Sequence, residues 1–204
     1  MSFGKLKLRL QALINRKDVT DEIAGSFVTE AIADLERVLR IGAMEALLTQ
    51  SEWDGVKNAV LIPNGFLEAI NLFTNDGELT QVDLANFIAD TGTSGPPRIF
   101  VKVADRWLLK PTPAVGSAVF LHYYGASVPL VADTDENVWA TSAFNAVVYT
   151  AAALAADFYQ MEDQYAQRFL KRANDYVTAI QEQDLDEKWS GRLAIPLPSD
   201  LGEF

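Results

Sequence analysis

The sequence contains no cysteine, which removes several kinds of site at once. Disulfide bonds, thiolate metal sites and cysteine nucleophiles are all excluded by count, and a reducing cytosol suits such a chain. Histidine is nearly absent as well, since His122 is the single one and stands beside Tyr123 and Tyr124 on a predicted strand. A histidine base needs a nucleophile and an orienting carboxylate, so we expect His122 to be structural.

Positive charge is scarce. The chain has 17 Lys and Arg residues against 28 Asp and Glu residues, which gives a formal net charge of −11. Proteins gain nucleic-acid affinity by placing Lys and Arg against the phosphates, where they displace counterions. The composition therefore disfavours direct DNA binding.

The sequence also lacks a long uninterrupted apolar run. The longest, Ala143 to Ala156, contains polar residues and is well short of the roughly 20 residues that span a bilayer. Near the N-terminus, Lys5, Lys7 and Arg9 alternate with leucines, whereas a signal peptide separates its charged region from a continuous apolar one. We expect no membrane helix and no export signal.

Familiar catalytic motifs are missing: the chain has no glycine-rich phosphate loop, no HExxH zinc motif and no GxSxG elbow. Their absence disfavours an enzyme but does not exclude one, because an enzyme can lack every familiar short motif. The acid pairs Asp133/Asp135 and Glu162/Asp163 could be metal ligands or general acids, but both flank predicted helix starts, where capping and the helix dipole account for them. We expect no catalytic residue, metal site or cofactor.

What the chain does contain is ordinary globular composition, with 204 residues of which 49% are apolar and 22% are charged. This length allows one domain, or one domain carrying an insertion. The predicted fold class is α+β but mainly α: an antiparallel helical bundle with a small antiparallel sheet as a β-rich insertion, and an extended C-terminal arm. The expected parts are N-terminal helices (1–55), the β-rich insertion (56–131), long C-terminal helices (132–189) and the arm (190–204).

Helical spacing of apolar residues predicts the bundle. A long helix is expected over Thr20 to Leu39, with Thr20 and Asp21 as capping candidates, and a shorter helix over residues 5 to 14. After Pro129 a second long helix is expected to start near Asp133. It is apolar nearly all round and rich in alanine, so it should be central to the fold. A final helix is predicted from about Glu162 to Gln183.

Between about Val56 and Val131 the pattern changes to short β-branched or aromatic segments separated by turn formers. Strands are expected over 60–62, 68–74, 78–83, 98–103, 106–110 and 118–124. Asn75-Asp76-Gly77 and Ala104-Asp105 are typical of hairpin turns, which predicts antiparallel pairing. Residues 90–97, rich in Gly and Pro, are expected to form a mobile surface loop and a possible contact surface.

Aromatic residues are numerous, but basic residues are not interleaved with them, so they are expected to be mostly core and not a base-stacking platform. The C-terminal arm, which begins at Ser190, differs because it is too apolar for a solubilising end. It either folds back onto its own chain or docks onto a neighbouring subunit or another protein. Its candidate docking residues are Leu193, Ile195, Leu197, Leu201 and Phe204.

An ordered series of features resembles the head-to-tail adaptor proteins of short-tailed bacteriophages. Leu108 to Pro113 has the family's L-x-x-P-x-P form, Val119 to Tyr124 is a strand ending in tyrosines, and Pro129-Leu130 leads into the helical pair. The segment from Thr20 to Arg40 is similar to the family's opening helix. The chain departs from the family at Glu136 to Trp139, where a threonine-asparagine-tryptophan run is expected.

The resemblance implies a structural protein that acts in the neck of the virion after synthesis in the host cytoplasm. It would form a ring, expected to be dodecameric, beneath the portal protein, although the isolated protein could be monomeric. The arm would reach the portal, and tail or nozzle proteins would bind the other side. DNA would pass through an acidic lumen without specific binding.

Two other interpretations remain. A tail-completion protein or another virion component has the same physical character with a different neighbour. A cytosolic enzyme or small-ligand-binding domain would need a pocket between the helices and the β insertion, and a deep polar pocket around His122 with converging acids would favour it.

Overall fold

The computed structural model describes residues 1–46, 49–92 and 94–190. The chain forms two compact units. The helical unit consists of Met1–Gly42 and Pro129–Phe204, the latter described as far as residue 190, and the β unit is the continuous stretch Ala43–Val128. Each unit has its own elements and its own buried side chains, and each is described separately.

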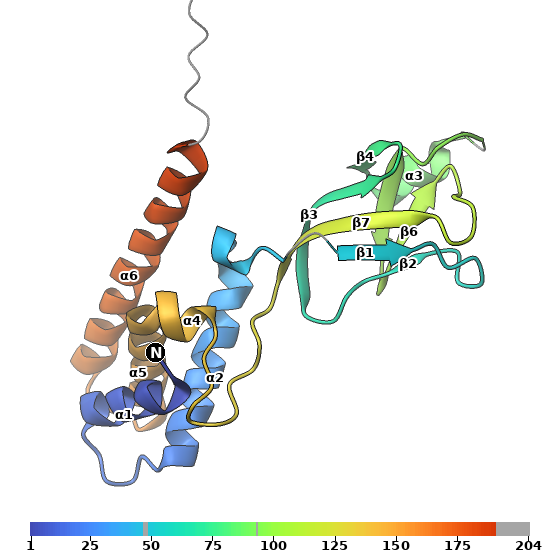
Figure 1. The fold of residues 1–204 in the computed structure, drawn as a ribbon. Helices are drawn as coiled ribbons and strands as arrows, with labels where there is room; N and C mark the ends of the chain where they lie inside the picture. Colours follow the sequence, from blue (N-terminus) through green and yellow to red (C-terminus); the bar gives the residue numbers. More distant parts are fainter. Residues whose placement is uncertain (47–48, 93, 191–204) are drawn as a thin grey trace, which may run out of the picture. The chain divides into compact units, whose positions relative to one another are not determined.

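The helical unit opens with two helices that follow the predicted pattern (Figure 1). They are α1 (Phe3–Ile14) and α2 (Asp21–Val38). Thr20 caps α2, because its side chain accepts a hydrogen bond from the backbone N–H of Ile23 at 3.3 Å. Ala24, Val28 and Leu35 are buried on the stripe that the spacing predicts. A short 3-10 turn (Gly42–Met44) follows.

Between Pro129 and residue 190 the helical unit continues with three helices: α4 (Val138–Ser142), α5 (Phe144–Phe158) and α6 (Asp163–Ser190). The prediction of one long helix from near Asp133 is wrong, since the helix begins at Val138 and breaks at Ala143, whose φ of −125° is not helical. The N-cap is Asn137, which accepts a hydrogen bond from the backbone N–H of Ala140 at 3.0 Å. The acidic residues upstream of Asn137 are not the cap.

Helix α5 is the central element of the helical unit, as predicted, and packs against α1, α2 and α6. Most of its buried side chains are alanines, which allow helix backbones to approach closely. The buried alanines are Ala146, Ala151, Ala152, Ala155 and Ala156. Among the described residues, no helix combines the length and the apolar character needed to cross a membrane.

The described residues of the β unit form seven strands and one short helix (Figure 1). They are β1 (Thr49–Glu52), β2 (Val60–Leu61), β3 (Phe66–Thr74), β4 (Gly77–Gln81), α3 (Leu84–Ala89), β5 (Ile99–Val103), β6 (Arg106–Lys110) and β7 (Ala118–Gly125). The strand order is β1-β7-β3-β4-β5-β6-β2. The edge strands β1 and β2 lie close together, so the sheet is nearly closed into a barrel.

Both predicted hairpins are present. Thr74 pairs with Gly77 across the two-residue turn of β3 and β4. Val103 pairs with Arg106 across the turn of β5 and β6, where Ala104 adopts a φ of 55°. The positive φ of Ala104 is the one that a primed turn needs at its first central residue, and primed turns match the twist of paired strands. In the β3–β4 hairpin the positive φ lies instead at Gly77.

The predicted fold class is wrong on two points. The sheet is not a small antiparallel addition to a mainly helical bundle, because it has seven strands and is mixed. Thr80 and Gln81 of β4 pair in parallel with Ile99 and Phe100 of β5. Helix α3 provides the crossover between them and was not predicted either, although Asp83 caps it at 2.7 Å from the backbone nitrogen of Asn86. Strand β1 was not predicted either, because its four residues are polar and lie in the range expected to be helical.

Large side chains fill the interior of the β unit. Trp107 is fully buried, and Trp53 and Phe100 are each 3% exposed. Leu72 and Leu121 lie beside them from adjacent strands. The inward-facing positions of a small barrel are filled by side chains, which accounts for the use of large apolar residues here.

Candidate interaction surfaces

The C-terminal arm predicted to dock lies outside the described residues. This holds for all five of its candidate docking residues, Leu193, Ile195, Leu197, Leu201 and Phe204. The described part of the chain ends at Ser190, the last residue of α6. In the sequence, the predicted arm begins where α6, the longest of the described helices, ends.

His122 lies on β7, opposite Asn71 of β3, and is half-buried. Its Nε2 atom is 3.3 Å from Oε2 of Glu45, which belongs to the segment entering the β unit. A protonated imidazole would attract this carboxylate more strongly than a neutral one. The contact links β7 to the entering segment.

The first acid pair, Asp133 and Asp135, shapes the connection before α4. Oδ2 of Asp135 accepts hydrogen bonds from the backbone N–H groups of Ala132, at 2.8 Å, and Val131, at 2.9 Å. These two bonds lower the pKa of the Asp135 carboxyl, with Ala132 as the larger cause. No group of three or more metal-ligating side chains occurs in the part of the chain that the structure describes.

The second acid pair lies where the sequence places it, at the start of a helix. Asp163 is the first residue of α6, and the backbone carbonyl of Glu162 accepts a hydrogen bond from the N–H of Tyr165 at 2.8 Å. A carboxylate in the first turn stabilises the partial positive charge of the helix N-terminus.

Lys7 is a buried cation that the sequence reasoning missed. Its side chain is only 7% exposed and pairs with two carboxylates, Asp21 and Asp133. The hydrogen bond to Asp133 is the largest cause of the raised pKa of Lys7, followed by the one to Asp21. Lys7 thereby connects α1 to the start of α2 and to the connection before α4. Its position four residues after the buried Phe3 is the signal that could have identified it.

Among the side chains that the structure describes, two aromatic ones are exposed, although the aromatic residues were expected to be mostly core. Phe158 is 65% exposed at the end of α5 and packs edge-on against Phe27 of α2, with ring centroids 5.5 Å apart. Tyr165 is 41% exposed near the start of α6. By contrast, Tyr149 and Tyr176 stack at 5.6 Å between α5 and α6.

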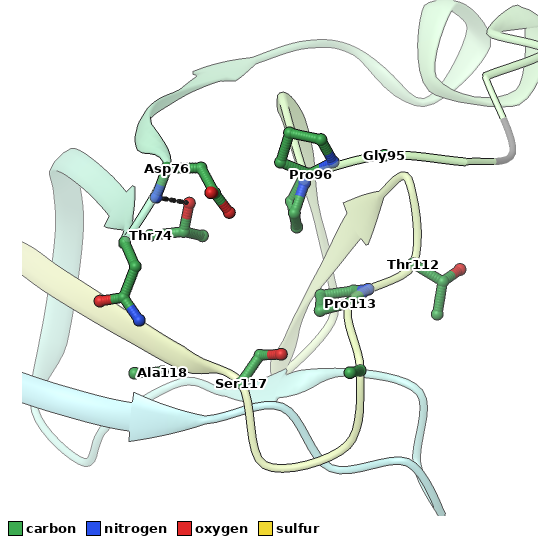
Figure 2. Close-up of a pocket in the computed structure, with 11 residues that line it drawn as sticks. Thr74, Asp76, Gly95, Pro96, Thr112, Pro113, Ser117 and Ala118 are labelled. Carbon is green, nitrogen blue, oxygen red and sulfur yellow. Dashed lines mark hydrogen bonds between the residues drawn. The ribbon is translucent and has the colours of Figure 1, made fainter.

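A polar pocket of about 230 Å³ lies at one end of the β unit (Figure 2). It is formed by the β3–β4 turn, residues 95–97 and the connection between β6 and β7. Figure 2 shows Thr74 and Asp76 facing Pro96, with Ser117 and Pro113 on the other side. The lining combines hydroxyl and carboxylate groups with flat proline rings, but its small size and open form indicate a surface hollow.

A second hollow, which we name the edge cleft, lies where β3 and β4 separate. It has a volume of about 430 Å³ and is lined by Ile70, Asn71, residues 78–81 and Phe100. Leu79 and Phe100 are core residues of the β unit, whereas Asn71 donates a side-chain hydrogen bond to Glu78. The edge cleft thus joins an apolar interior to a polar rim.

Comparison with protein families gives one match that covers nearly the whole chain. The model of the SU10 adaptor protein family matches residues 1–196. A comparison with curated proteins found no match. The family match includes both units and the ordered strand, tyrosine and helix series on which the resemblance to phage head-to-tail adaptors rests. The chain belongs to the SU10 adaptor protein family, a family of phage adaptor proteins.

Proposed function

We propose that this protein assembles as a ring beneath the portal of a phage virion, where it extends the DNA channel and provides a platform for tail or nozzle proteins. The observation that carries the proposal is the family match over residues 1–196. The proposed ring is a dodecamer, formed when the portal is present, and the isolated protein is a monomer or associates weakly. The work of such a protein is mechanical, without a catalytic residue or a cofactor.

The charge of the chain supports the proposed channel. A net charge of −11 disfavours adhesion of the phosphate backbone, so DNA would pass through a lumen built from such subunits without specific binding. The two compact units also suit an adaptor, because each can offer its own surface to a different neighbour. The virion neck is the proposed location, after synthesis in the host cytoplasm.

The alternative of a tail-completion protein differs from this proposal only in the neighbour that the ring contacts. The alternative of an enzyme has less support. His122 contacts Glu45 on the surface of the β unit, and both the polar pocket and the edge cleft are lined by other residues.

Electron microscopy of the purified protein mixed with its cognate portal tests the proposal. We expect a ring of added density below the portal, with twelvefold symmetry. If the correct portal is supplied and no complex forms, the proposal is wrong. A complex with tail proteins in the absence of portal binding would instead support the tail-completion alternative.

Removal of residues 190–204 tests the role of the C-terminal arm. We expect portal-dependent assembly to be lost while the melting temperature changes little, because the arm contributes to contacts between molecules. A full-length variant with Leu193, Ile195 and Leu197 changed to Ser should behave like the deletion. A variant with Ser199, Asp200 and Glu203 changed to Ala is the matched control and should assemble. A large fall in melting temperature would instead mean that the arm packs on its own chain.

A further inference from the structure

Strand β3 is paired unequally on its two sides. On one side it pairs with β7 from Phe66 to Thr74. On the other side its pairing with β4 begins at the hairpin turn and ends at Leu72. Beyond that point β4 pairs with β5 instead. The two strands of the hairpin therefore diverge, and the edge cleft opens between them.

Ile70 stands at the point of divergence. The register between β3 and β7 shifts between Ala69 and Asn71, so Ile70 is the extra residue of a β-bulge. Bulges of this kind redirect a side chain or terminate strand pairing, and they are over-represented at sheet edges and next to active sites. Ile70 lines the edge cleft together with Leu79 and Phe100, each 3% exposed. An apolar side chain entering the cleft would contact Ile70, within a lining that also contains Asn71 and the polar residues of β4.

A strand edge beside a hollow with an apolar interior and a polar rim suits an extended segment that adds to the sheet. In this mode of recognition the backbone of the segment bonds to the strand edge, and alternate side chains enter the hollow. The segment should carry apolar residues at every second position. It should also tolerate an unpaired outer edge, since none of the described strands is paired with β3 beyond Leu72 on this side.

The C-terminal arm contains such a segment. Leu193, Ile195 and Leu197 occupy alternate positions, so their side chains would share one face of a strand. Their backbone N–H and C=O groups would also point toward one edge. Pro196 and Pro198, which lack the N–H group, occupy the opposite parity. The prolines would therefore lie on the outer edge, the position in a sheet where proline is tolerated.

We propose that Leu193–Leu197 of a second copy of this chain adds as a strand at the Ile70 edge of β3 and places apolar side chains in the edge cleft. This inference rests on the proposed ring. In a ring with head-to-tail contacts, each copy would donate one segment and receive one, so that every edge cleft is filled when the ring closes. The occupant is thus another adaptor subunit.

Disulfide trapping tests the proposed contact directly, since the natural chain contains no cysteine. One protein carries Ile70→Cys and the other, distinguished by an affinity tag, carries Ile195→Cys. The two are mixed with the portal and oxidised. We expect a mixed disulfide dimer that forms at least about tenfold faster than with the control acceptor Val115→Cys, because docking raises the local thiol concentration toward the millimolar range. Val115 is 79% exposed on the same unit and does not line the edge cleft.

A pair of proline variants tests the strand geometry without disturbing the folded units. Ile195→Pro removes an N–H group that would bond to β3, whereas Ala194→Pro removes one that would face outward. In full-length chains that carry Leu197→Cys, we expect Ile195→Pro to reduce trapping to Ile70→Cys by about tenfold. Ala194→Pro should leave it nearly unchanged. Equal effects of the two prolines would overturn the added strand.

The outcomes separate this inference from the proposed function. If a ring forms on the portal but no mixed disulfide appears, the strand contact is wrong and the ring stands. If no ring forms with the cognate portal, the proposed function is wrong. A chain with both cysteines that forms its disulfide internally, even within the ring, would overturn the second copy as the occupant.

Discussion

The two units of this adaptor protein fill their interiors with side chains of different size. In the helical unit, alanines of α5 meet the neighbouring helices, and small residues permit the short distances between helix axes. In the β unit, Trp53, Trp107 and Phe100 fill the space enclosed by the sheet. We therefore expect the stability of the helical unit to fall most when buried side chains are made larger. The stability of the β unit should fall most when they are made smaller.

The two units also differ in the number of sequence segments that form them. The β unit is one continuous stretch, whereas the helical unit joins two segments that are far apart in the sequence. Contacts between those segments include the backbone bond from Phe3 N–H to the carbonyl of Asp135, at 2.9 Å. They also include the buried bond from the indole Nε1–H of Trp139 to Glu36, at 2.8 Å. Such contacts hold the helical unit together across the inserted β unit.

The largest expected effect comes from removing the central tryptophan of the β unit. Trp107→Ala should lower the free energy of unfolding of that unit by about 3–5 kcal/mol, because it leaves a large cavity. Hydrogen exchange measured by mass spectrometry should show lost protection within residues 43–128, with the helices protected as before. Trp139→Ala is the matched variant in the helical unit and should give the reverse pattern. Equal loss of protection in both units would contradict the prediction.

A smaller effect is expected from added volume in the helical unit. Ala151, on α5, is fully buried, so Ala151→Leu should lower the free energy of unfolding by about 1–3 kcal/mol through overpacking. Denaturant titration followed by circular dichroism measures this change. Ala179→Leu, at an exposed position of α6, is the control and should be nearly neutral. If both substitutions were neutral, the close packing around α5 would not limit side-chain size.

The hydrogen bond between the two segments of the helical unit should contribute less. Trp139→Phe keeps an aromatic ring but removes the donor to Glu36, which we expect to lower the free energy of unfolding by about 1 kcal/mol. A double-mutant cycle with Glu36→Ala, which removes the acceptor, measures the coupling between the two side chains. A coupling energy of zero would show that the bond does not help to join the segments.

The smallest effect is expected on the melting temperature at acidic pH. The bonded Asp135 carboxyl has a lowered pKa, so the unfolded chain binds its proton more readily than the folded chain. Its stabilising contribution is present above the unfolded pKa of about 4 and is lost as the pH falls through the lower folded value. In Asp135→Asn the melting temperature should therefore fall less steeply from about pH 5 to about pH 3. Asp157→Asn removes the same charge from α5 and is the charge-matched control; an identical slope in both variants would contradict the prediction.

Local signals in the sequence determined several features of this protein. Thr20 starts α2 because a side-chain oxygen satisfies an N–H group of the first turn. Asn75-Asp76-Gly77 and Ala104-Asp105 make hairpins because a two-residue turn depends on residues that are adjacent in the chain. The ordered series of strand, tyrosines and helix also identified the family, which the match over residues 1–196 confirms.

Only the tertiary structure decided the features that depend on distant pairing. Strand β4 pairs in parallel with β5, and the sheet is nearly closed. The sequence of each strand does not indicate which other strand it pairs with. Lys7 is buried because Asp21 and Asp133, which are remote from it in the sequence, converge on its ammonium group. The edge cleft likewise exists because β4 pairs with β3 only next to the hairpin turn and then pairs with β5. Spacing along a chain reports which face of an element is apolar, but which elements meet is decided by the free energy of the whole packed unit.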